Sequence, residues 1–269
     1  MTKPQLAIGV FDSGMGGLTV LRALKHRLPN ESFIYLGDTA RLPYGTKSLQ
    51  TVTHYAKQMA RVLVKRRIKA LVIACNTATT AALPHLQAML PHIPVLGVVA
   101  PGAMAAVRAT LNQRIIVLAT ETTIATEAYH NLITTELPKA TILSRGCSVL
   151  VALAEEGLVD NAMAETALLH YLKDRQDEDT VLLGCTHFPV FKPLLSRLLP
   201  ENIRVVDSAD ATANALQHIL TENGLLNPNH STTGKTQYLV TDSISRFQKV
   251  GELFLNEPLL ISDIELIDV

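Results

Sequence analysis

Two stretches of the chain decide its fold, LVIACNTATTAALPHLQ (71–87) and VLLGCTHFPVFKPLLSRL (181–198). Each begins with a short apolar run, passes through a cysteine and a turn that contains threonine, and ends in a segment with helical spacing. Both therefore predict the same strand–turn–helix unit, which is the building block of parallel sheets. Because Cys75 and Cys185 occupy matching positions in the two units, the sequence predicts two similar halves that face each other across a cleft.

The same alternation of apolar runs and amphipathic segments continues along the whole chain. The runs predicted as strands are 6–11, 32–37, 70–74, 95–98, 114–119, 140–144, 180–184, 203–207 and 237–241. The segments predicted as helices include 17–27, 50–66, 78–89, 103–111 and 160–173. Strands that alternate with helices are typical of an α/β fold, in which helices cover both faces of mainly parallel sheets.

We therefore predict two pseudo-symmetric, doubly wound α/β lobes with the active site in the cleft between them. Residues 1–97 plus 208–269 are assigned to the first lobe, and residues 98–207 to the second. The division rests on the repeated unit and on the family resemblance given below. Ligands of such sheets bind where strands end and helices begin, so the residues just after each strand are the candidates for a site.

Composition and charge exclude several classes of protein. Hydrophobic residues make up 48% of the 269 residues, and Lys plus Arg equal Asp plus Glu at 24 each, so no basic face for nucleic acid is predicted. The N-terminus has no signal-peptide layout, and the most apolar stretch, 95–107, is too short to span a bilayer. None of the three cysteines has metal-ligand spacing, so we expect a cytoplasmic protein with reduced thiols and no metal.

Cys75 and Cys185 each lie between the end of a predicted strand and the start of a predicted helix. Unpaired backbone N–H groups and the positive helix end are expected to lower the pKa of a thiol there from about 8.5. A thiol near its pKa serves as base and as acid, so two opposed thiols suit removal of a proton from one face of a carbon and its return to the other. Either cysteine alone fits a structural role equally well. Cys147, in SRGCSV, is predicted to be structural.

Each thiol has a candidate helper close to a strand end. His187 follows Cys185 by two positions, and Asp12 ends the first predicted strand. The carboxylate of Asp12 could instead cap the following helix, a role that Ser13 could also take. No Rossmann or phosphate-loop motif occurs, and no lysine has the setting of a Schiff-base residue. We therefore expect no cofactor.

A substrate carboxylate needs hydrogen-bond donors, and polar residues beside both cysteines can supply them. Asn76, Thr77 and Thr186 offer side-chain donors and N–H groups at helix starts. The loop GDTARLPYGTKS (37–48) adds a Pro-Tyr-Gly turn, which suits closure over a ligand. These segments are predicted to bind the substrate.

The chain resembles the glutamate racemases of the aspartate/glutamate racemase family over nearly its whole length. The similar segments are GVFDSGMGGLTVL (9–21), YLGDTARLPYGTKS (35–48), VIACNTAT (72–79), LAEEG (153–157), LLGCTHFP (182–189) and VVDSA (205–209). ACNTA and GCTH, in this order beside DSG and PYG, are specific to this family. PYG together with DSGxGG favours its glutamate branch.

The resemblance implies an isomerase that interconverts L- and D-glutamate without a cofactor, supplies D-glutamate for peptidoglycan synthesis and forms a homodimer. It implies that Cys75 and Cys185 are the catalytic acid/bases, that Asp12 and His187 assist them, and that Glu155 rather than Glu156 orients His187. The residues that it implies as contacts of the substrate are Asp12, Ser13, Tyr44, Gly45, Asn76, Thr77, Thr186 and His187.

Three other functions remain open from the sequence. The nearest is an aspartate or broader amino-acid racemase on the same scaffold. A decarboxylase or hydrolase that uses Cys185 with His187 would leave Cys75 idle, so replacement of Cys75 distinguishes it. A two-lobed module that binds an amino acid without turning it over is the third, and a time course of optical rotation would reveal it.

Overall fold

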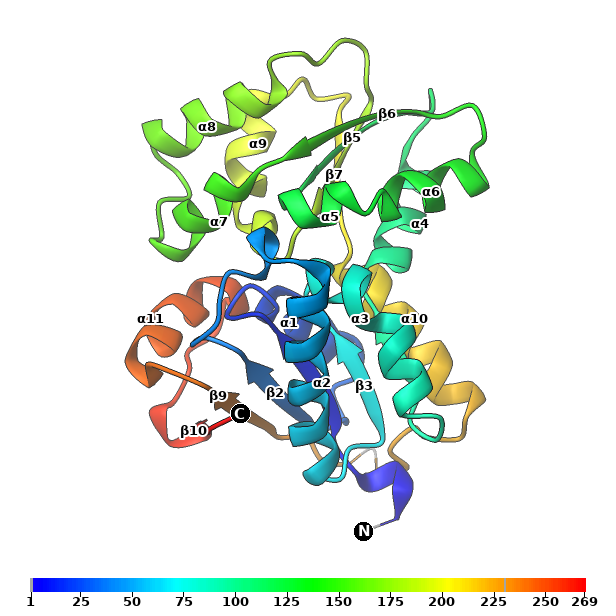
Figure 1. Cartoon of the computed structure of the whole chain (residues 1–269), viewed down its shortest axis with the longest axis vertical. Coiled ribbons are helices and arrows are strands. Elements are labelled where there is room, and N and C mark those ends of the chain that lie inside the picture. Colours follow the sequence, from blue (N-terminus) through cyan, green and yellow to red (C-terminus); the bar gives the residue numbers. More distant parts are fainter. Residues whose placement is uncertain (1, 230) are drawn as a thin grey trace.

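The computed structural model describes residues 2–229 and 231–269 and contains two separate sheets. The strand order is β10-β9-β2-β1-β3-β4 in the six-stranded sheet and β6-β5-β7-β8 in the four-stranded sheet, and the paired strands are parallel. We call the six-stranded sheet and the helices packed on it the first lobe, and the four-stranded sheet with its helices the second lobe. They occupy the lower and upper halves of Figure 1. The predicted α/β class with mainly parallel sheets is confirmed.

All the predicted strands are present, with ends that differ by at most two residues. In the first lobe they are β1 Ile8–Asp12, β2 Phe33–Gly37, β3 Ala70–Ile73, β4 Val95–Gly97 and β9 Thr236–Val240, to which the structure adds β10 Ile264–Leu266. In the second lobe they are β5 Arg114–Ala119, β6 Thr141–Gly146, β7 Thr180–Gly184 and β8 Arg204–Asp207. The strands of each sheet lie within the residues assigned to that lobe, while the boundaries themselves stay a prediction.

Helices connect the parallel strands, as such sheets require. Those of the first lobe are α1 Leu18–Arg27, α2 Leu49–Lys65, α3 Asn76–Met89, α10 Ala209–Glu222 and α11 Ile244–Leu255. Those of the second lobe are α4 Val99–Ala109, α5 Glu121–Ala125, α6 Ala128–Glu136, α7 Ser148–Glu155, α8 Ala162–Leu172 and α9 Lys192–Leu198. Short 3-10 turns are η1 Lys3–Gln5, η2 Tyr44–Thr46, η3 Phe188–Phe191 and η4 Ile261–Asp263. None of the helices in the described residues is long and apolar enough to cross a membrane.

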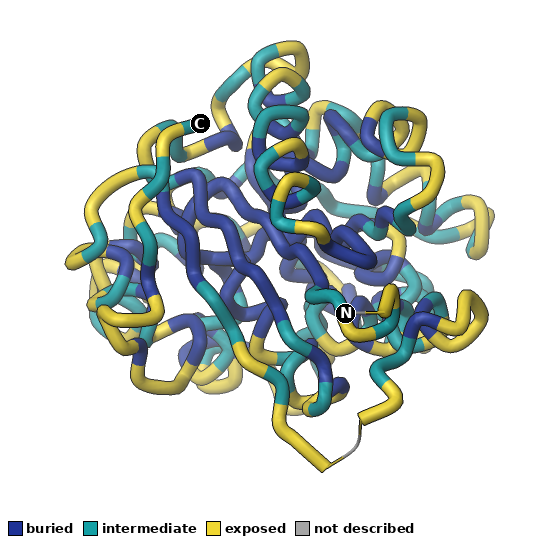
Figure 2. The backbone as a smooth tube through the Cα atoms, turned by 90° about the horizontal axis from the view of Figure 1, so that it is seen from below, coloured by how far each residue is buried: buried dark blue, intermediate teal, exposed yellow. Residues whose placement is uncertain are grey.

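Both sheets are covered on their two faces, because alternate residues of a strand point to opposite sides. In β1, Ile8 and Val10 belong to a core shared with α1, whereas Phe11 packs with α2 and α3. In β5, Ile116 packs towards α7, α8 and α9, and Ile115 packs towards α4 and α6. Figure 2 shows the buried strands at the centre, with exposed positions on the outer turns and helix surfaces. This arrangement explains why the strands read as continuous apolar runs.

Candidate active site

Residues that follow strand ends in both lobes meet around one small pocket of about 20 Å³. The first lobe contributes Ser13, Leu42, Pro43, Tyr44, Gly45, Cys75, Asn76 and Thr77, and the second contributes Thr120, Val151, Glu155, Cys185, Thr186 and His187. The structure therefore brings together around one pocket all the site residues predicted from the sequence except Asp12. Since about 10–15 Å³ of such volume holds one water molecule, the pocket in this state has room for only one or two waters.

Cys75 lies directly before α3 and caps it. Its Sγ accepts a hydrogen bond from the N–H of Ala78 (3.4 Å), and its thiol donates to Oγ of Ser13 (3.6 Å). Burial and, to a smaller extent, the nearby charge of Asp12 raise the pKa of the Cys75 thiol to about 12. The prediction that the helix start lowers this pKa is therefore wrong, because loss of solvent outweighs the backbone donor.

Cys185 follows β7 and is in contact with a buried histidine. Nδ1 of His187 lies 3.8 Å from its Sγ, and Nε2 of His187 lies 3.1 Å from Oε1 of Glu155. Burial lowers the pKa of His187, but hydrogen bonds to Cys185 and Glu155 outweigh burial and raise it to about 10. His187 is therefore a buried imidazolium at neutral pH, held between two groups that can accept its protons. Glu156, in contrast, is exposed and pairs with Arg246.

The raised pKa of His187 makes stability depend on pH. Its folded-state value of about 10 lies above the ordinary 6.5, so protonation of His187 stabilises the fold fully below pH 6.5, and this contribution is lost as the pH rises to 10. We expect the free energy of unfolding to fall over this range by up to about 1.4 kcal/mol per pH unit. His187→Asn should lack this part of the slope, and urea denaturation at several pH values measures it. Equal slopes in the two proteins would contradict the assignment of the raised pKa to His187. Cys75 is present in both proteins, so its own titration contributes equally to the two slopes.

Asp12 lies behind the pocket wall and is fully buried. Its Oδ2 accepts the N–H of Gly14 (2.9 Å), and its Oδ1 accepts the hydroxyl of Thr186 from the second lobe (3.4 Å). Burial raises the pKa of Asp12, and the positive charge of His187 opposes this shift. Helix α1 begins after Gly17, which has no side chain to cap it, and the Asp12 carboxylate lies against the backbone at Gly14 and Gly17, so the capping role considered for Asp12 stays open.

The Tyr44 side chain is anchored in the first lobe and does not offer its hydroxyl to the pocket. The hydroxyl donates to Oδ2 of the buried Asp38, whose carboxylate also accepts Nε of Arg41 (2.7 Å) and the hydroxyl of Thr241 (3.0 Å). Burial and the Asp38 charge raise the pKa of Tyr44. The 37–48 loop is thus fixed at Tyr44, and it is the Tyr44–Gly45 turn that lines the pocket.

Hydroxyl groups join the two lobes around the pocket. Thr77 lies 2.9 Å from Oγ1 of Thr120, and Thr122 donates to the carbonyl of Gly45 (2.9 Å). The lobes approach so closely that a Cβ on Gly16 would lie 2.4 Å from Nδ1 of His187. Glycine is therefore required at position 16 while the lobes are closed.

The sequence analysis did not assign Thr120 and Val151 to the site. Thr120 follows β5 and caps α5, which repeats the strand–polar residue–helix pattern of the two cysteines. This pattern was a usable signal for Thr120. Val151 lies inside α7, and nothing in its local sequence distinguishes it from a core residue.

Asn76 provides a buried donor on the pocket wall. Its Oδ1 accepts the hydroxyl of Tyr129 (2.6 Å), whereas its Nδ2 has no hydrogen-bond partner among the described residues. A buried amide donor without a partner costs about 1–3 kcal/mol, so it is retained only where something compensates. A ligand oxygen in the pocket would satisfy it.

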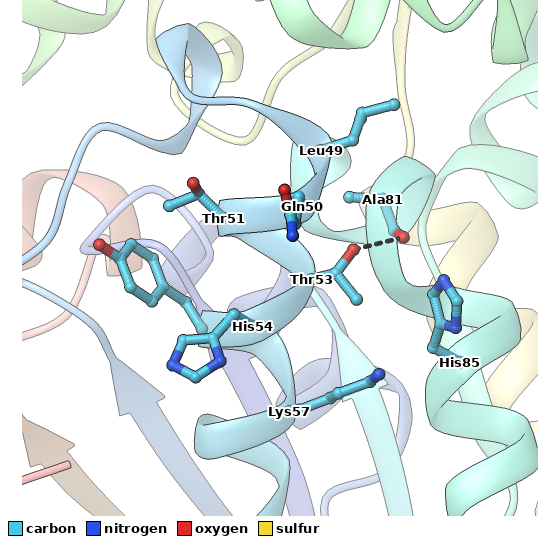
Figure 3. Close-up of a pocket in the computed structure, with 9 residues that line it drawn as sticks. Leu49, Gln50, Thr51, Thr53, His54, Lys57, Ala81 and His85 are labelled. Carbon is cyan, nitrogen blue, oxygen red and sulfur yellow. Dashed lines mark hydrogen bonds between the residues drawn. The ribbon is translucent and has the colours of Figure 1, made fainter.

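A larger hollow of about 900 Å³ lies on the outside of the first lobe between α2 and α3 (Figure 3). Its polar lining includes His54, Lys57 and His85, and Thr53 donates to the carbonyl of Ala81 across it. It contains no cysteine and no buried carboxylate. The pair of thiols predicted to exchange a carbon-bound proton is thus found in the small pocket between the lobes and not in this hollow. No cluster of His, Cys, Asp or Glu with the geometry of a metal site occurs within residues 2–229 and 231–269.

Comparisons with known proteins agree with this geometry. A sequence profile of the Asp/Glu/hydantoin racemase family matches residues 8–216. A glutamate racemase from Geobacter metallireducens is 46% identical over 254 residues, which cover 94% of this chain and 93% of that protein.

Two solved structures are similar over 98% or more of the chain. The glutamate racemase of Francisella tularensis, in complex with D-glutamate, superposes with a TM-score of 0.90 at 35% identity and covers 98% of each chain. That of Thermus thermophilus, in complex with β-chloro-D-alanine, has a TM-score of 0.88 at 39% identity and covers 99% of this chain and 98% of its own. This chain therefore belongs to the Asp/Glu/hydantoin racemase family of isomerases.

Proposed function

We propose that the protein interconverts L- and D-glutamate, with Cys75 and Cys185 acting on opposite faces of the substrate Cα. The observation that carries this proposal is that corresponding strand ends of the two sheets bring one thiol each to the same pocket. The D-glutamate complex of the similar Francisella protein supports glutamate as the substrate.

The proposed reaction exchanges one proton for another. One sulfur, as thiolate, removes the Cα proton, and the resulting carbanion takes a proton from the thiol on the other face. The first sulfur ends as a thiol and the second as a thiolate, so the two enantiomers need opposite protonation of the pair. This is general acid–base catalysis in which each group serves in both roles.

The surroundings of the two thiols differ and suit one of these two states. Burial keeps Cys75 neutral, because its pKa lies near 12. Nδ1 of His187 lies 3.8 Å from Sγ of Cys185, so this ring can exchange a proton with that sulfur. In this proposal Glu155 fixes the ring of His187, and Asp12 acts on Cys75 through its charge rather than by contact.

Donors around the pocket would bind the two substrate carboxylates. Nδ2 of Asn76 is without a partner, and Thr77 and Thr186 add hydroxyls at the starts of helical turns. The Tyr44–Gly45 turn adds backbone groups to the pocket lining. Because the closed pocket measures only about 20 Å³, glutamate can enter only after the lobes separate, which breaks the hydroxyl contacts between them.

Three further properties belong to this proposal through the family resemblance. The product D-glutamate would serve peptidoglycan synthesis, the protein would work in the cytoplasm, and two copies of the chain would associate. The bacterial origin of the similar glutamate racemases supports the first of these. Light scattering of the purified protein tests the third.

Incubation of the protein with L-glutamate in heavy water tests the reaction and the substrate together. We expect D-glutamate to accumulate with deuterium at Cα, because the proton returned to the carbon comes from a thiol that has exchanged with solvent. Chiral chromatography measures the enantiomers, and mass spectrometry measures the label. Protein dialysed against a chelator, with no pyridoxal phosphate added, should be fully active.

Control incubations separate this proposal from the alternatives. Faster racemisation of aspartate than of glutamate would give the protein a different substrate. Binding of glutamate without exchange or inversion would make it a binding module. Activity that appears only with a metal or pyridoxal phosphate would contradict the two-thiol mechanism.

A further inference from the structure

Tyr129 is a buried side chain of α6 in the second lobe that reaches the first lobe through its hydroxyl group. The hydroxyl donates to Oδ1 of Asn76 over 2.6 Å, directly after Cys75 at the start of α3. Asn76 lines the pocket, whereas Tyr129 does not. The contact therefore connects a helix of the second lobe to a candidate substrate-binding group of the first.

The contact determines which end of the Asn76 carboxamide is available. A carboxamide has one acceptor oxygen and one donor nitrogen, and it can present either after a half-turn. Tyr129 occupies the oxygen, and Nδ2 is left buried without a partner in the described part of the chain. With Tyr129 in place, Asn76 presents a donor to a ligand rather than an acceptor. A donor suits a carboxylate, which only accepts hydrogen bonds.

The surroundings of Tyr129 keep its hydroxyl in the donating form. Burial raises the pKa of Tyr129, and the nearby Cys185 and Asp207 raise it further. The hydroxyl thus stays protonated and donates to Asn76 throughout the pH range in which proteins are ordinarily active. Its ring packs in the core with Ile133 and Leu182, which holds its position.

We propose that Tyr129 is a positioning residue that orients the Asn76 carboxamide so that Nδ2 donates to a carboxylate oxygen of the substrate. The inference rests on the proposed function, because it requires a substrate with a carboxylate. Since Tyr129 and Asn76 belong to different lobes, the donor is oriented only when the lobes are closed. Open protein would hold Asn76 with a free amide, and closure would set its direction.

A double-mutant cycle between Tyr129→Phe and Asn76→Ala tests this role. A hydrogen bond of this kind contributes about 0.5–1.5 kcal/mol, so Tyr129→Phe should raise KM for glutamate about two- to tenfold and change kcat less. In the Asn76→Ala background, Tyr129→Phe should have no further effect on KM. Tyr171→Phe in α8, which removes a hydroxyl of the same lobe away from the pocket, is the matched control and should leave KM unchanged.

An equal effect of Tyr129→Phe in both backgrounds would overturn the inference, because it would show that Tyr129 acts through packing. A second variant tests the donor without altering Tyr129. Asn76→Asp keeps an acceptor for the tyrosine but replaces Nδ2 by an oxygen, so KM should rise more than in Asn76→Ala. Wild-type affinity in Asn76→Asp would overturn the donor role. A wild-type protein that does not act on glutamate would instead overturn the proposed function, and the inference with it.

Discussion

Cys75→Ala and Cys185→Ala are each expected to abolish racemisation while leaving the fold intact. In the proposed mechanism each thiol is the acid/base for one face of Cα, so neither variant can complete the exchange of protons. Both side chains are buried at the pocket, and alanine removes only the sulfur atom, so the packing changes little. Polarimetry with each enantiomer measures turnover, and circular dichroism measures the fold.

Cys147→Ala is the matched control for these variants. Cys147 is also buried, and its thiol donates to the carbonyl of Arg145 (3.4 Å), but it does not line the pocket. Its replacement should lower stability slightly and leave turnover close to that of the wild type. A comparable loss of turnover in Cys147→Ala would show that replacement of any buried cysteine inactivates this protein. The losses in Cys75→Ala and Cys185→Ala would then not support a catalytic role for these two thiols.

Serine variants test which face of the substrate Cα each thiol serves. Because each sulfur serves one face, Cys75→Ser and Cys185→Ser should slow the reactions of the two enantiomers unequally, and in opposite senses. A glutamate analogue with a leaving group on Cβ separates the steps, since loss of that group follows removal of the Cα proton alone. Identical impairment of both variants with both enantiomers would contradict the assignment of one base to each face.

The order of strands and helices could be predicted from the sequence because the central strands β1, β2, β3, β5 and β7 are buried on both faces. Such strands need continuous apolar runs, and these are visible without a structure. Strand β10 was missed because Ile264–Leu266 is too short to show periodicity and pairs only with β9 at the edge of its sheet. The ends of β1 and β6 shifted by up to two residues, since hydrogen bonds and not hydrophobicity fix where a strand stops.

Most of the candidate site could be predicted for a related reason. Parallel strands of one sheet end at the same edge, so the polar residues that follow β1 and β3 had to lie close together. The residues that follow β7 belong to the other sheet, and the repeated strand–cysteine–helix unit predicted that they face the first set across the cleft. Val151, which lines the pocket, and Tyr129, which contacts Asn76 behind it, could not be found this way, because both lie within helices of the second lobe. The direction of the shift in the Cys75 pKa could not be predicted either, since it depends on how completely the lobes exclude water.

Asp12→Asn is expected to lower kcat by about 10²–10⁴-fold, as for loss of an acid–base helper, with a smaller change in KM. Asparagine keeps one oxygen, which can accept from the N–H of Gly14, and places an NH2 group where Oδ1 accepts the hydroxyl of Thr186, so it removes the negative charge and reverses the direction of the weaker contact. That charge acts on Cys75 and on His187 without touching either, so its loss should also shift the pH profile of kcat. Steady-state kinetics with both enantiomers over a range of pH measures both effects.

Asp207→Asn is the matched control. The segment VVDSA (205–209) is similar in sequence to VFDSG (10–14), and Asp207 occupies the position in it that Asp12 occupies in VFDSG. Asp207 accepts the N–H of Ala209 (2.7 Å) and pairs with Lys192, but it does not line the pocket. Its variant should lose some stability and keep its turnover. If Asp12→Asn also kept its turnover and its pH profile of kcat, the role of Asp12 would be limited to stabilising the turn at Gly14. A stable Asp12→Asn protein with slow turnover and a shifted profile would place its charge in the mechanism.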